Sequence, residues 1–203
     1  SFEVIADYTD GLMQMDADGA AIPALAETYD ISEDGKTYTF HLRDAKWSNG
    51  DAVTAADFVF GWHRAVDPAT ASEYSYMLSD IGQIVNAAEI IAGEKPVTDL
   101  GVTAVDDKTL EVQLNVPVSY FLSLMYFPTF YPVNEAFYNS CADTFGTSPD
   151  TVLSNGAFKL TDYQPAATAF TLEKNPDYYD ADKIALDSLA YQVIKDSQQA
   201  LMS

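Results

Sequence analysis

The chain has 203 residues, 48% of them apolar and 13% aromatic, which is enough to bury the core of one domain or of two small ones. Its 31 Asp and Glu residues against 10 Lys and Arg give a formal net charge of −21, which repels phosphate backbones and anionic lipid surfaces and argues against nucleic-acid binding. The single cysteine, Cys141, excludes an internal disulfide and a thiolate metal cluster.

The first forty residues predict short elements joined by turns. A short helical pattern comes first, residues 16–19 form a turn, and Pro23 is predicted to open a helix over 24–27. A tight turn at 33–36 then leads into strict alternation of apolar and polar residues, which predicts a half-buried strand. The buried face of this strand carries Tyr38, Phe40 and Leu42.

The next segment predicts two helices. Thr54 is placed to cap the first helix, with Asp57 as its capping-box partner, and Asp67-Pro68 ends it. A second helix is predicted over 84–92, closed by Gly93. The apolar positions of the first helix recur at helical spacing: Phe58, Val59, Trp62 and Val66.

The second half of the chain is predicted to be mostly β. Residues 102–105 and 109–114 form a hairpin, 119–127 read as a short buried helix, and 128–149 are rich in loops. Ser197 is predicted to cap a further helix that the sequence does not complete, which indicates a piece of a longer protein. Three β segments are predicted, with a turn at 164–165 between the first two: 157–160, 170–174 and 189–194.

Motifs of catalysis and metal binding are absent from the sequence. It has no Gly-x-Ser-x-Gly elbow, P-loop or Gly-x-Gly-x-x-Gly motif. His41 and His63 lack partners at metal-ligand spacing and are interpreted as surface or half-buried histidines. Two calcium-like loops beginning at Asp16 and Asp30 lack required positions and are interpreted as Asx turns. We therefore predict no enzyme activity, no catalytic residue, no metal site and no cofactor.

Tyrosines gather in predicted loops and at the ends of elements. Tyrosine combines rigid contact area with a hydroxyl, which suits the recognition of polar, partly apolar ligands. For any single tyrosine of this set, packing at the margin of the core is the simpler interpretation. The set comprises Tyr74, Tyr76, Tyr120, Tyr126, Tyr131, Tyr138, Tyr178 and Tyr179.

Four segments occur in a fixed order along the chain: DGKTYTFHLRDAKWSNGDAVTAADFVFGWHRAVDP, LGVTAVDDKTLEVQL, SNGAFKL and LEKNPDYYDA. Together they resemble the family-5 extracellular solute-binding proteins of peptide ABC transporters, over about residues 4–200. The stretch 38–68 is the most specific, since a strand, a Lys-Trp-Ser-Asn-Gly-Asp turn and a capped helix rarely coincide. These motifs are interpreted as scaffold, so they indicate the family better than the ligand.

The resemblance implies the fold and its division. The expected fold is α/β, a fragment of the two-lobed type II periplasmic-binding-protein fold. Residues 12–135 would form the additional domain attached to lobe I, and 1–11 and 136–203 would form part of lobe I. Lobe II would be absent, with most of the groups that select the ligand. By itself this fragment is expected to bind ligand poorly.

The resemblance also implies a function. The chain would belong to the substrate-binding component of a peptide ABC importer, which captures oligopeptides by lobe closure and delivers them to a membrane permease. It would be a monomer, exported to the periplasm or held at the cell surface as a lipoprotein. One alternative is the same fold binding another solute, namely a dipeptide, a nickel complex, haem, a sugar or a pheromone. Another is a surface adhesion or signalling protein that reuses the fold.

Three candidate ligand-binding residues follow from the resemblance. Tyr74, within SEYSY, falls near the place where peptide-binding members have a tyrosine in the cleft, and Tyr76 is the alternative for that place. Asn155, within SNGA, leads into a strand of lobe I, and its loop is expected to approach the cleft. A plain turn role for Asn155 is the alternative interpretation.

Overall fold

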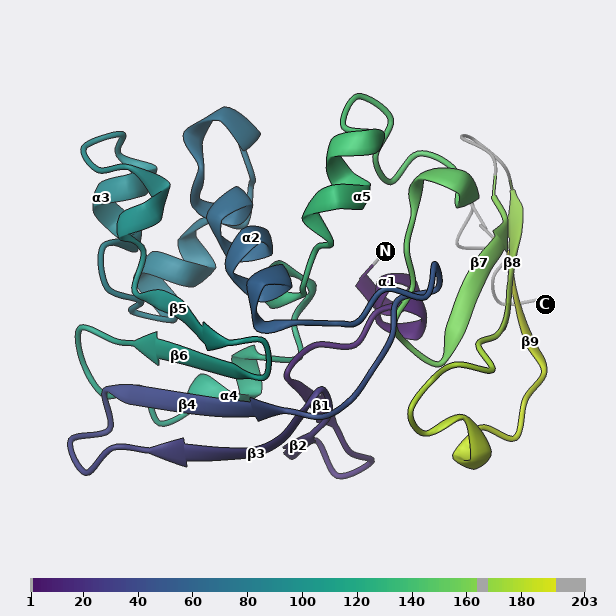
Figure 1. The fold of residues 1–203 in the computed structure, drawn as a ribbon, viewed down its shortest axis with the longest axis horizontal. Helices are drawn as coiled ribbons and strands as arrows, with labels where there is room; N and C mark the ends of the chain where they lie inside the picture. The colour runs from purple at the N-terminus through teal and green to yellow at the C-terminus, as the bar shows by residue number, and fades with distance from the viewer. Residues whose placement is uncertain (1, 164–167, 193–203) are drawn as a thin grey trace, which may run out of the picture.

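The computed structural model describes residues 2–163 and 168–192 and has a mixed α/β architecture (Figure 1). Within these residues a four-stranded sheet and a three-stranded sheet lie at opposite ends of the view, with helix α1 (Phe2–Tyr8) between them. A short antiparallel pair, β1 (Met13–Met15) and β2 (Ala21–Pro23), follows α1. The predicted turn at 164–165 and the predicted cap at Ser197 fall outside the described residues.

The four-stranded sheet is antiparallel, with the order β3-β4-β6-β5. The buried side chains of β4 are those that the alternation predicted, and Phe40 of β4 lies opposite Leu110 of β6 with both fully buried. Register shifts interrupt both outer strands, between Ala26 and Thr28 and between Ala104 and Asp106. The strands are β3 (Ala26–Ile31), β4 (Thr37–Leu42), β5 (Val102–Asp106) and β6 (Thr109–Gln113).

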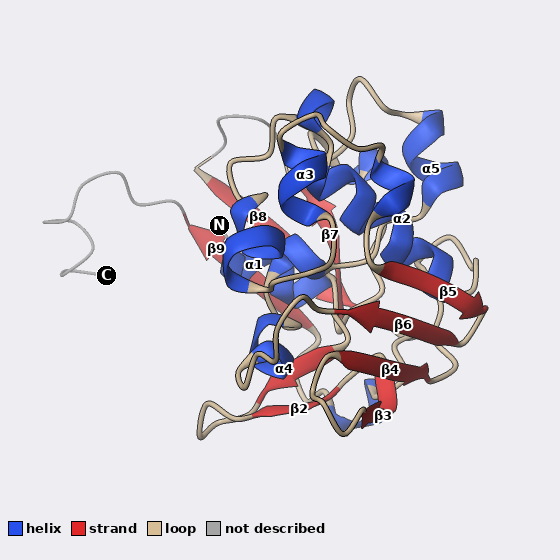
Figure 2. Ribbon diagram, turned by 90° about the vertical axis from the view of Figure 1, so that its left-hand side faces the viewer, coloured by secondary structure: helices blue, strands red, loops and turns tan. Residues whose placement is uncertain are grey.

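Helix α2 (Ala55–Val66) lies on the β5 side of this sheet together with α3 (Ala87–Ile91) (Figure 2). As predicted, Thr54 is the N-cap of the helix, and its backbone N–H donates to Asp57 Oδ2 at 3.0 Å. The same oxygen accepts the indole N–H of Trp47 at 2.9 Å, which ties the preceding turn to the helix. Phe58 and Trp62 are fully buried on the inner face, as the helical spacing predicted.

Gly61 lets α2 approach the segment 131–133 closely. A Cβ at this position would lie 2.6 Å from the carbonyl oxygen of Tyr131. In a helix alanine is normally more stable than glycine by about 1 kcal/mol. Here we expect the steric clash between the added Cβ and the backbone to cost more than this gain. We expect Gly61→Ala to lower the free energy of unfolding by about 1–3 kcal/mol in urea denaturation.

The matched control for Gly61→Ala is Ala56→Gly, at an exposed position of the same helix. This change alters helix propensity alone and is expected to cost up to about 1 kcal/mol. If Gly61→Ala stabilised the chain instead, the close approach of α2 to residues 131–133 would be contradicted.

The three-stranded sheet is antiparallel, with the order β7-β8-β9, and α1 packs against it. The backbone N–H groups of Asn155 and Gly156 both donate to the carbonyl of Tyr8 at 3.1 Å, which joins the end of α1 to the start of the sheet. Phe170 and Tyr191 stack on neighbouring strands with centroids 5.0 Å apart. The strands are β7 (Phe158–Asp162), β8 (Ala169–Lys174) and β9 (Ser188–Gln192).

The helix predicted over 24–27 is wrong. Strand β2 ends at Pro23 and β3 begins at Ala26. The N–H groups of residues 24 and 26 donate to the carbonyl of Leu12, and that of Leu25 donates to Gly11. The backbone therefore pairs with a distant segment, and this pairing overrides the local preference that Pro23 suggested.

Two helices differ from prediction in their bounds, and a third was not predicted. α3 begins three residues later than expected, because Ile84 forms a β-bridge with Leu114 and Asn86 has a φ of 65°. α4 (Phe121–Leu124) is shorter than the predicted segment. α5 (Glu135–Ser140) lies in the stretch predicted as loop, and the side chain of Asn134 caps it by accepting the N–H of Phe137 at 2.9 Å.

Short helical turns complete the described chain. They are η1 (Pro68–Thr70), η2 (Met77–Ile81), η3 (Val97–Asp99), η4 (Pro128–Phe130), η5 (Pro149–Thr151) and η6 (Ala181–Lys183).

Candidate functional site

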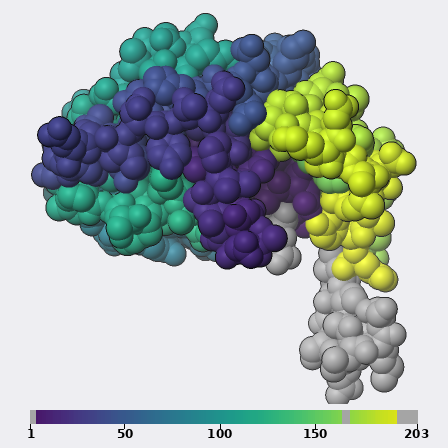
Figure 3. All heavy atoms as spheres, turned by 90° about the horizontal axis from the view of Figure 1, so that it is seen from below, coloured from purple at the N-terminus to yellow at the C-terminus, as the bar shows by residue number. Residues whose placement is uncertain are grey.

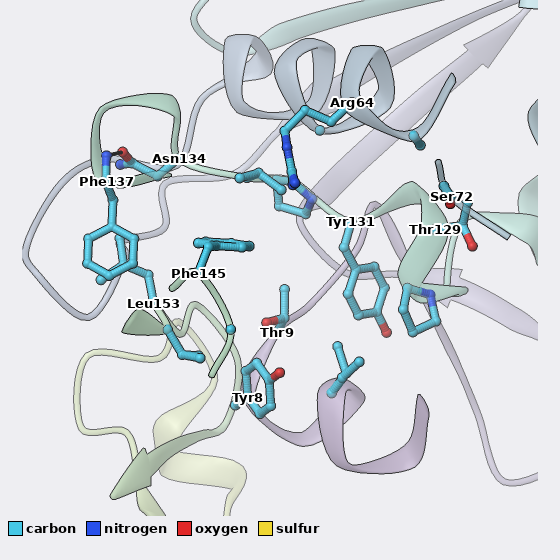
Figure 4. Close-up of a pocket in the computed structure, with 18 of the residues that line it drawn as sticks. Tyr8, Thr9, Arg64, Ser72, Thr129, Tyr131, Asn134, Phe137, Phe145 and Leu153 are labelled. Atoms are coloured by element: carbon cyan, nitrogen blue, oxygen red, sulfur yellow. Dashed lines mark hydrogen bonds between the residues drawn. The ribbon is translucent and has the colours of Figure 1, made fainter. Parts of the chain in front are cut away.

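A cavity of about 440 Å³ lies where α1, α2 and the segments 128–134 and 137–153 meet. Figure 4 shows Arg64 reaching into it from α2, with Tyr8 and Thr9 facing it from the end of α1. Phe145 and Leu153 form one wall, and Tyr131 forms the other. The volume lies within the roughly 300–1,000 Å³ of small-molecule pockets. The cavity is therefore large enough to take a ligand.

Tyr8, which is half-buried, and Tyr131, which is buried, stay neutral at physiological pH. Burial raises the pKa of Tyr8, and the nearby Tyr163 adds to this effect. Burial also raises the pKa of Tyr131, further than for Tyr8, and the charges of Asp10 and Asp7 raise it more. The hydroxyl of Tyr131 donates to the carbonyl of Tyr126 at 3.0 Å, which holds its ring against the cavity. These residues offer apolar surface and hydrogen-bonding groups but no charge.

Tyr74 and Tyr76 lie on the chain just before η2. Tyr74 lines the cavity and is 39% exposed, whereas Tyr76 is 44% exposed and its ring centroid lies 6.4 Å from that of Tyr74. The geometry thus brings the first of the two predicted residues to the cavity. Their role as ligand contacts stays a prediction.

Asn155 lies at the junction of α1 and β7, and it is not among the described residues that line the cavity. Its side chain is 1% exposed, and its Oδ1 accepts the backbone N–H of Asp10 at 2.7 Å. Its Nδ2 is buried and has no hydrogen-bond partner among the described residues. The contact with Asp10 fits the plain turn role that is the alternative interpretation of Asn155, and its role as a ligand contact stays a prediction.

Asp10 is a buried carboxylate that the sequence patterns did not single out. Its Oδ2 accepts the hydroxyls of Tyr178 at 2.8 Å and Tyr179 at 2.6 Å, and the amide of Gln14 at 2.9 Å. Burial raises the pKa of Asp10, and these hydrogen bonds oppose that shift only in part. Figure 3 shows the C-terminal segment against the N-terminal part of the chain, where this cluster forms. A carboxylate that accepts three hydrogen bonds from two other segments connects those segments, so we interpret Asp10 as a structural residue and not as a member of an acid–base pair.

The described residues form neither a metal-binding cluster nor a membrane-spanning helix. Within 2–163 and 168–192, no three His, Cys, Asp or Glu side chains are arranged to hold a metal ion. In the same ranges no helix has the length and apolar character needed to cross a membrane. Cys141 is a free, half-buried thiol.

A family model described as bacterial extracellular solute-binding proteins, family 5 Middle, matches residues 20–203. The periplasmic oligopeptide-binding protein OppA of Escherichia coli K12 is 44% identical over 186 residues, 91% of this chain and 34% of that protein. The probable deoxycholate-binding periplasmic protein YgiS of the same organism is 42% identical over 196 residues, 96% of this chain and 36% of that protein.

Solved structures show the same likeness. Listeria monocytogenes OppA bound to peptide matches with a TM-score of 0.93 and 43% identity, over 99% of this chain and 39% of that one. The chain therefore spans about a third of the length of the curated relatives it matches. The α/β fold predicted from the sequence is confirmed.

Proposed function

The chain belongs to the bacterial extracellular solute-binding proteins of family 5, and on that basis we propose that it serves in the solute-binding component of an ABC importer for oligopeptides. The observation that carries this proposal is the cavity beside Tyr74 in a chain whose relatives bind peptides. Such a protein captures its solute by closure around it and delivers it to a membrane permease. Tyr74, Tyr76 and Asn155 are the proposed contact residues of this chain.

The nature of the cavity supports binding over catalysis. Apolar and aromatic side chains form most of its walls, with few other polar side chains between them: Thr9, Arg64, Thr70, Ser72, Thr129 and Asn134. Such walls with a few orienting polar groups are typical of binding pockets. The matched relatives are solute-binding proteins, and we propose that this chain likewise has no enzyme activity and needs no cofactor.

Export follows from the family, whose members are extracellular. Location in the periplasm or as a lipoprotein at the cell surface, and a monomeric state, are proposals. We also propose that residues 12–135 form the additional domain and that 1–11 and 136–203 belong to lobe I. The separation of the β3-β4-β6-β5 sheet from the β7-β8-β9 sheet supports this division. The contacts of Gln14 with Tyr178 and Tyr179 would then join the two parts.

A chimera tests the oligopeptide function directly. Residues 20–192 would replace the matching segment of E. coli OppA, and the chimera would be expressed in cells that lack their own OppA. We expect peptide uptake to be restored, because the two segments share sequence and fold. Tyr74→Ala in the chimera is expected to weaken peptide binding roughly tenfold, the scale of an aromatic contact residue.

The controls of this experiment are the unaltered OppA and the chimera with Val105→Ala. Val105 is 60% exposed on β5, and this change is expected to leave binding unchanged. A chimera that is folded and exported but binds no peptide would contradict the proposed function.

A second candidate is the binding of an amphipathic acid, as the name of YgiS indicates for that protein. The observation in its favour is the apolar lining of the cavity with a cation, Arg64, at one side. Adding deoxycholate to the chimera as a competitor of peptide distinguishes the two candidates. If deoxycholate displaces the peptide at low deoxycholate concentration, the result favours the acid. If deoxycholate does not displace the peptide, the result favours the oligopeptide.

A further inference from the structure

Arg64 is the one charged residue among the described side chains that line the cavity. The chain as a whole carries 31 acidic residues, yet none of the described lining residues is Asp or Glu. Figure 4 shows the guanidinium directed into the space between the walls. The cavity therefore offers a local positive charge inside a strongly negative protein.

Two aromatic rings hold the guanidinium by its face. The Cζ atom of Arg64 lies 4.0 Å from the ring centroid of Tyr138 and 5.5 Å from that of Phe145. These two rings meet edge to face, with centroids 5.1 Å apart, so they form a fixed platform. Stacking occupies the face of the guanidinium and leaves its N–H groups, which point outward in its plane, available to an acceptor.

Within residues 2–163 and 168–192, Arg64 has no carboxylate within 4.0 Å and donates no side-chain hydrogen bond. The other arginine of the chain, Arg43, differs in this respect. It also stacks on a ring, that of Tyr179, but its Nε donates to the carbonyl of Ala24. Both arginines therefore stack on an aromatic ring. In the described part of the chain, only Arg64 directs its guanidinium into the cavity without a hydrogen bond to the protein (Figure 4).

We propose that Arg64 binds a carboxylate of the solute, whose apolar part lies against Tyr8, Tyr131 and Phe145. The planar fork of a guanidinium matches the two oxygens of a carboxylate, and partial burial strengthens the pair. This inference rests on the proposed function and refines it, because it names the group of the solute that the cavity recognises. The carboxylate can come from the C-terminus of a peptide or from an acidic side chain.

Residues of this chain alone form the cavity, so weak binding of a small probe is expected even without lobe II. Nuclear magnetic resonance of the whole chain labelled with 15N-arginine detects such weak binding and tests the proposal. The sequence contains only Arg43 and Arg64, so two Nε–Hε signals are expected, and Arg64→Lys assigns them. The first probe is N-acetyl-Gly-Phe, which has a free carboxylate, and the second is its neutral C-terminal amide. The net charge of −21 opposes a general attraction of the acid to the protein, so a preference for the acid indicates a specific cation.

We expect the acid to shift the Arg64 signal in a saturable way, at a concentration at least about tenfold lower than the amide, while the Arg43 signal stays in place. Arg64→Gln, followed by the signals of the cavity aromatics, is expected to bind the two probes equally. Arg64→Lys keeps the charge and is expected to retain part of the preference. Circular dichroism of both variants confirms that they fold.

A third probe, N-acetyl-Asp-Phe-amide, moves the carboxylate to a side chain. If it matches the acid, the site takes a side-chain carboxylate, and if it behaves as the amide, the site takes a C-terminus. Equal binding of acid and amide by the unaltered chain overturns the proposal, and so does an Arg64 signal that neither probe moves. Either result leaves peptide uptake by the OppA chimera intact as evidence for the proposed function. Conversely, a chimera without uptake beside a saturable Arg64 shift rejects the oligopeptide function alone.

Discussion

Replacing Trp62 with alanine is expected to lower the free energy of unfolding by about 3–5 kcal/mol. The side chain is fully buried on α2, and its ring meets that of Phe130 edge to face with centroids 5.4 Å apart. Its indole N–H donates to the carbonyl of Phe130 at 2.9 Å, so truncation also leaves a buried acceptor unpaired. The melting temperature, followed by circular dichroism, is expected to fall by roughly 10 °C.

The control is Tyr76→Ala, which removes an aromatic ring that is 44% exposed. A surface change of this kind is expected to alter stability by no more than about 0.5 kcal/mol. Similar melting temperatures for the two variants would show that Trp62 is not at the centre of the core. A loss confined to Trp62→Ala would establish that α2 is held by this residue.

Asp10→Ala is expected to destabilise the chain by about 3 kcal/mol, because it leaves two tyrosine hydroxyls and an amide without their shared acceptor. Each buried donor left unpaired costs roughly 1–3 kcal/mol, and the removal of a buried charge returns part of this. Asp10→Asn keeps an acceptor oxygen for Tyr178 and Tyr179. It is therefore expected to be much closer to the unaltered chain in urea denaturation.

The pH dependence of Asp10→Asn has a definite sign. Burial raises the pKa of Asp10 in the folded chain above the ordinary value of 3.8. The contribution of Asp10 to stability is therefore complete below that ordinary value and is lost as pH rises through the folded pKa. Because the side-chain amide of the Asp10→Asn variant does not titrate, this variant is expected to gain stability relative to the unaltered chain across this range. Parallel curves from acid to neutral pH would contradict the raised pKa.

The elements that the sequence predicted well are those whose conformation depends on residues close together in the sequence. Helix α2 follows from a capping residue and apolar spacing, and strand β4 follows from alternation within six residues. The segment 24–27 failed because its backbone bonds to Leu12 and Gly11, which no local pattern reveals. Helix α5 was missed because its six residues are too few to form a regular apolar stripe.

The candidate site was predictable only in part. Tyr74 could be proposed because a family resemblance placed it, and the structure brings it to the cavity. In the cluster at Asp10, the partners Tyr178 and Tyr179 are separated from Asp10 by 168 and 169 positions in the sequence. No pattern near Asp10 therefore predicts the cluster. Arg64 lies on a helix that was predicted, but Tyr138 and Phe145, the rings on which it stacks, come from a stretch predicted as loop.

The register shifts in β3 and β5 bear on self-association. Exposed outer strands offer unpaired backbone groups to other chains, and proteins guard against fibril formation by distorting such strands and placing charge on them. Both outer strands of the four-stranded sheet combine a shift with exposed carboxylates, Glu27 and Asp30 on β3 and Asp106 on β5. A second copy approaching either strand would meet an irregular ladder and like charge. The sheet is therefore protected against edge-to-edge aggregation by its own strands.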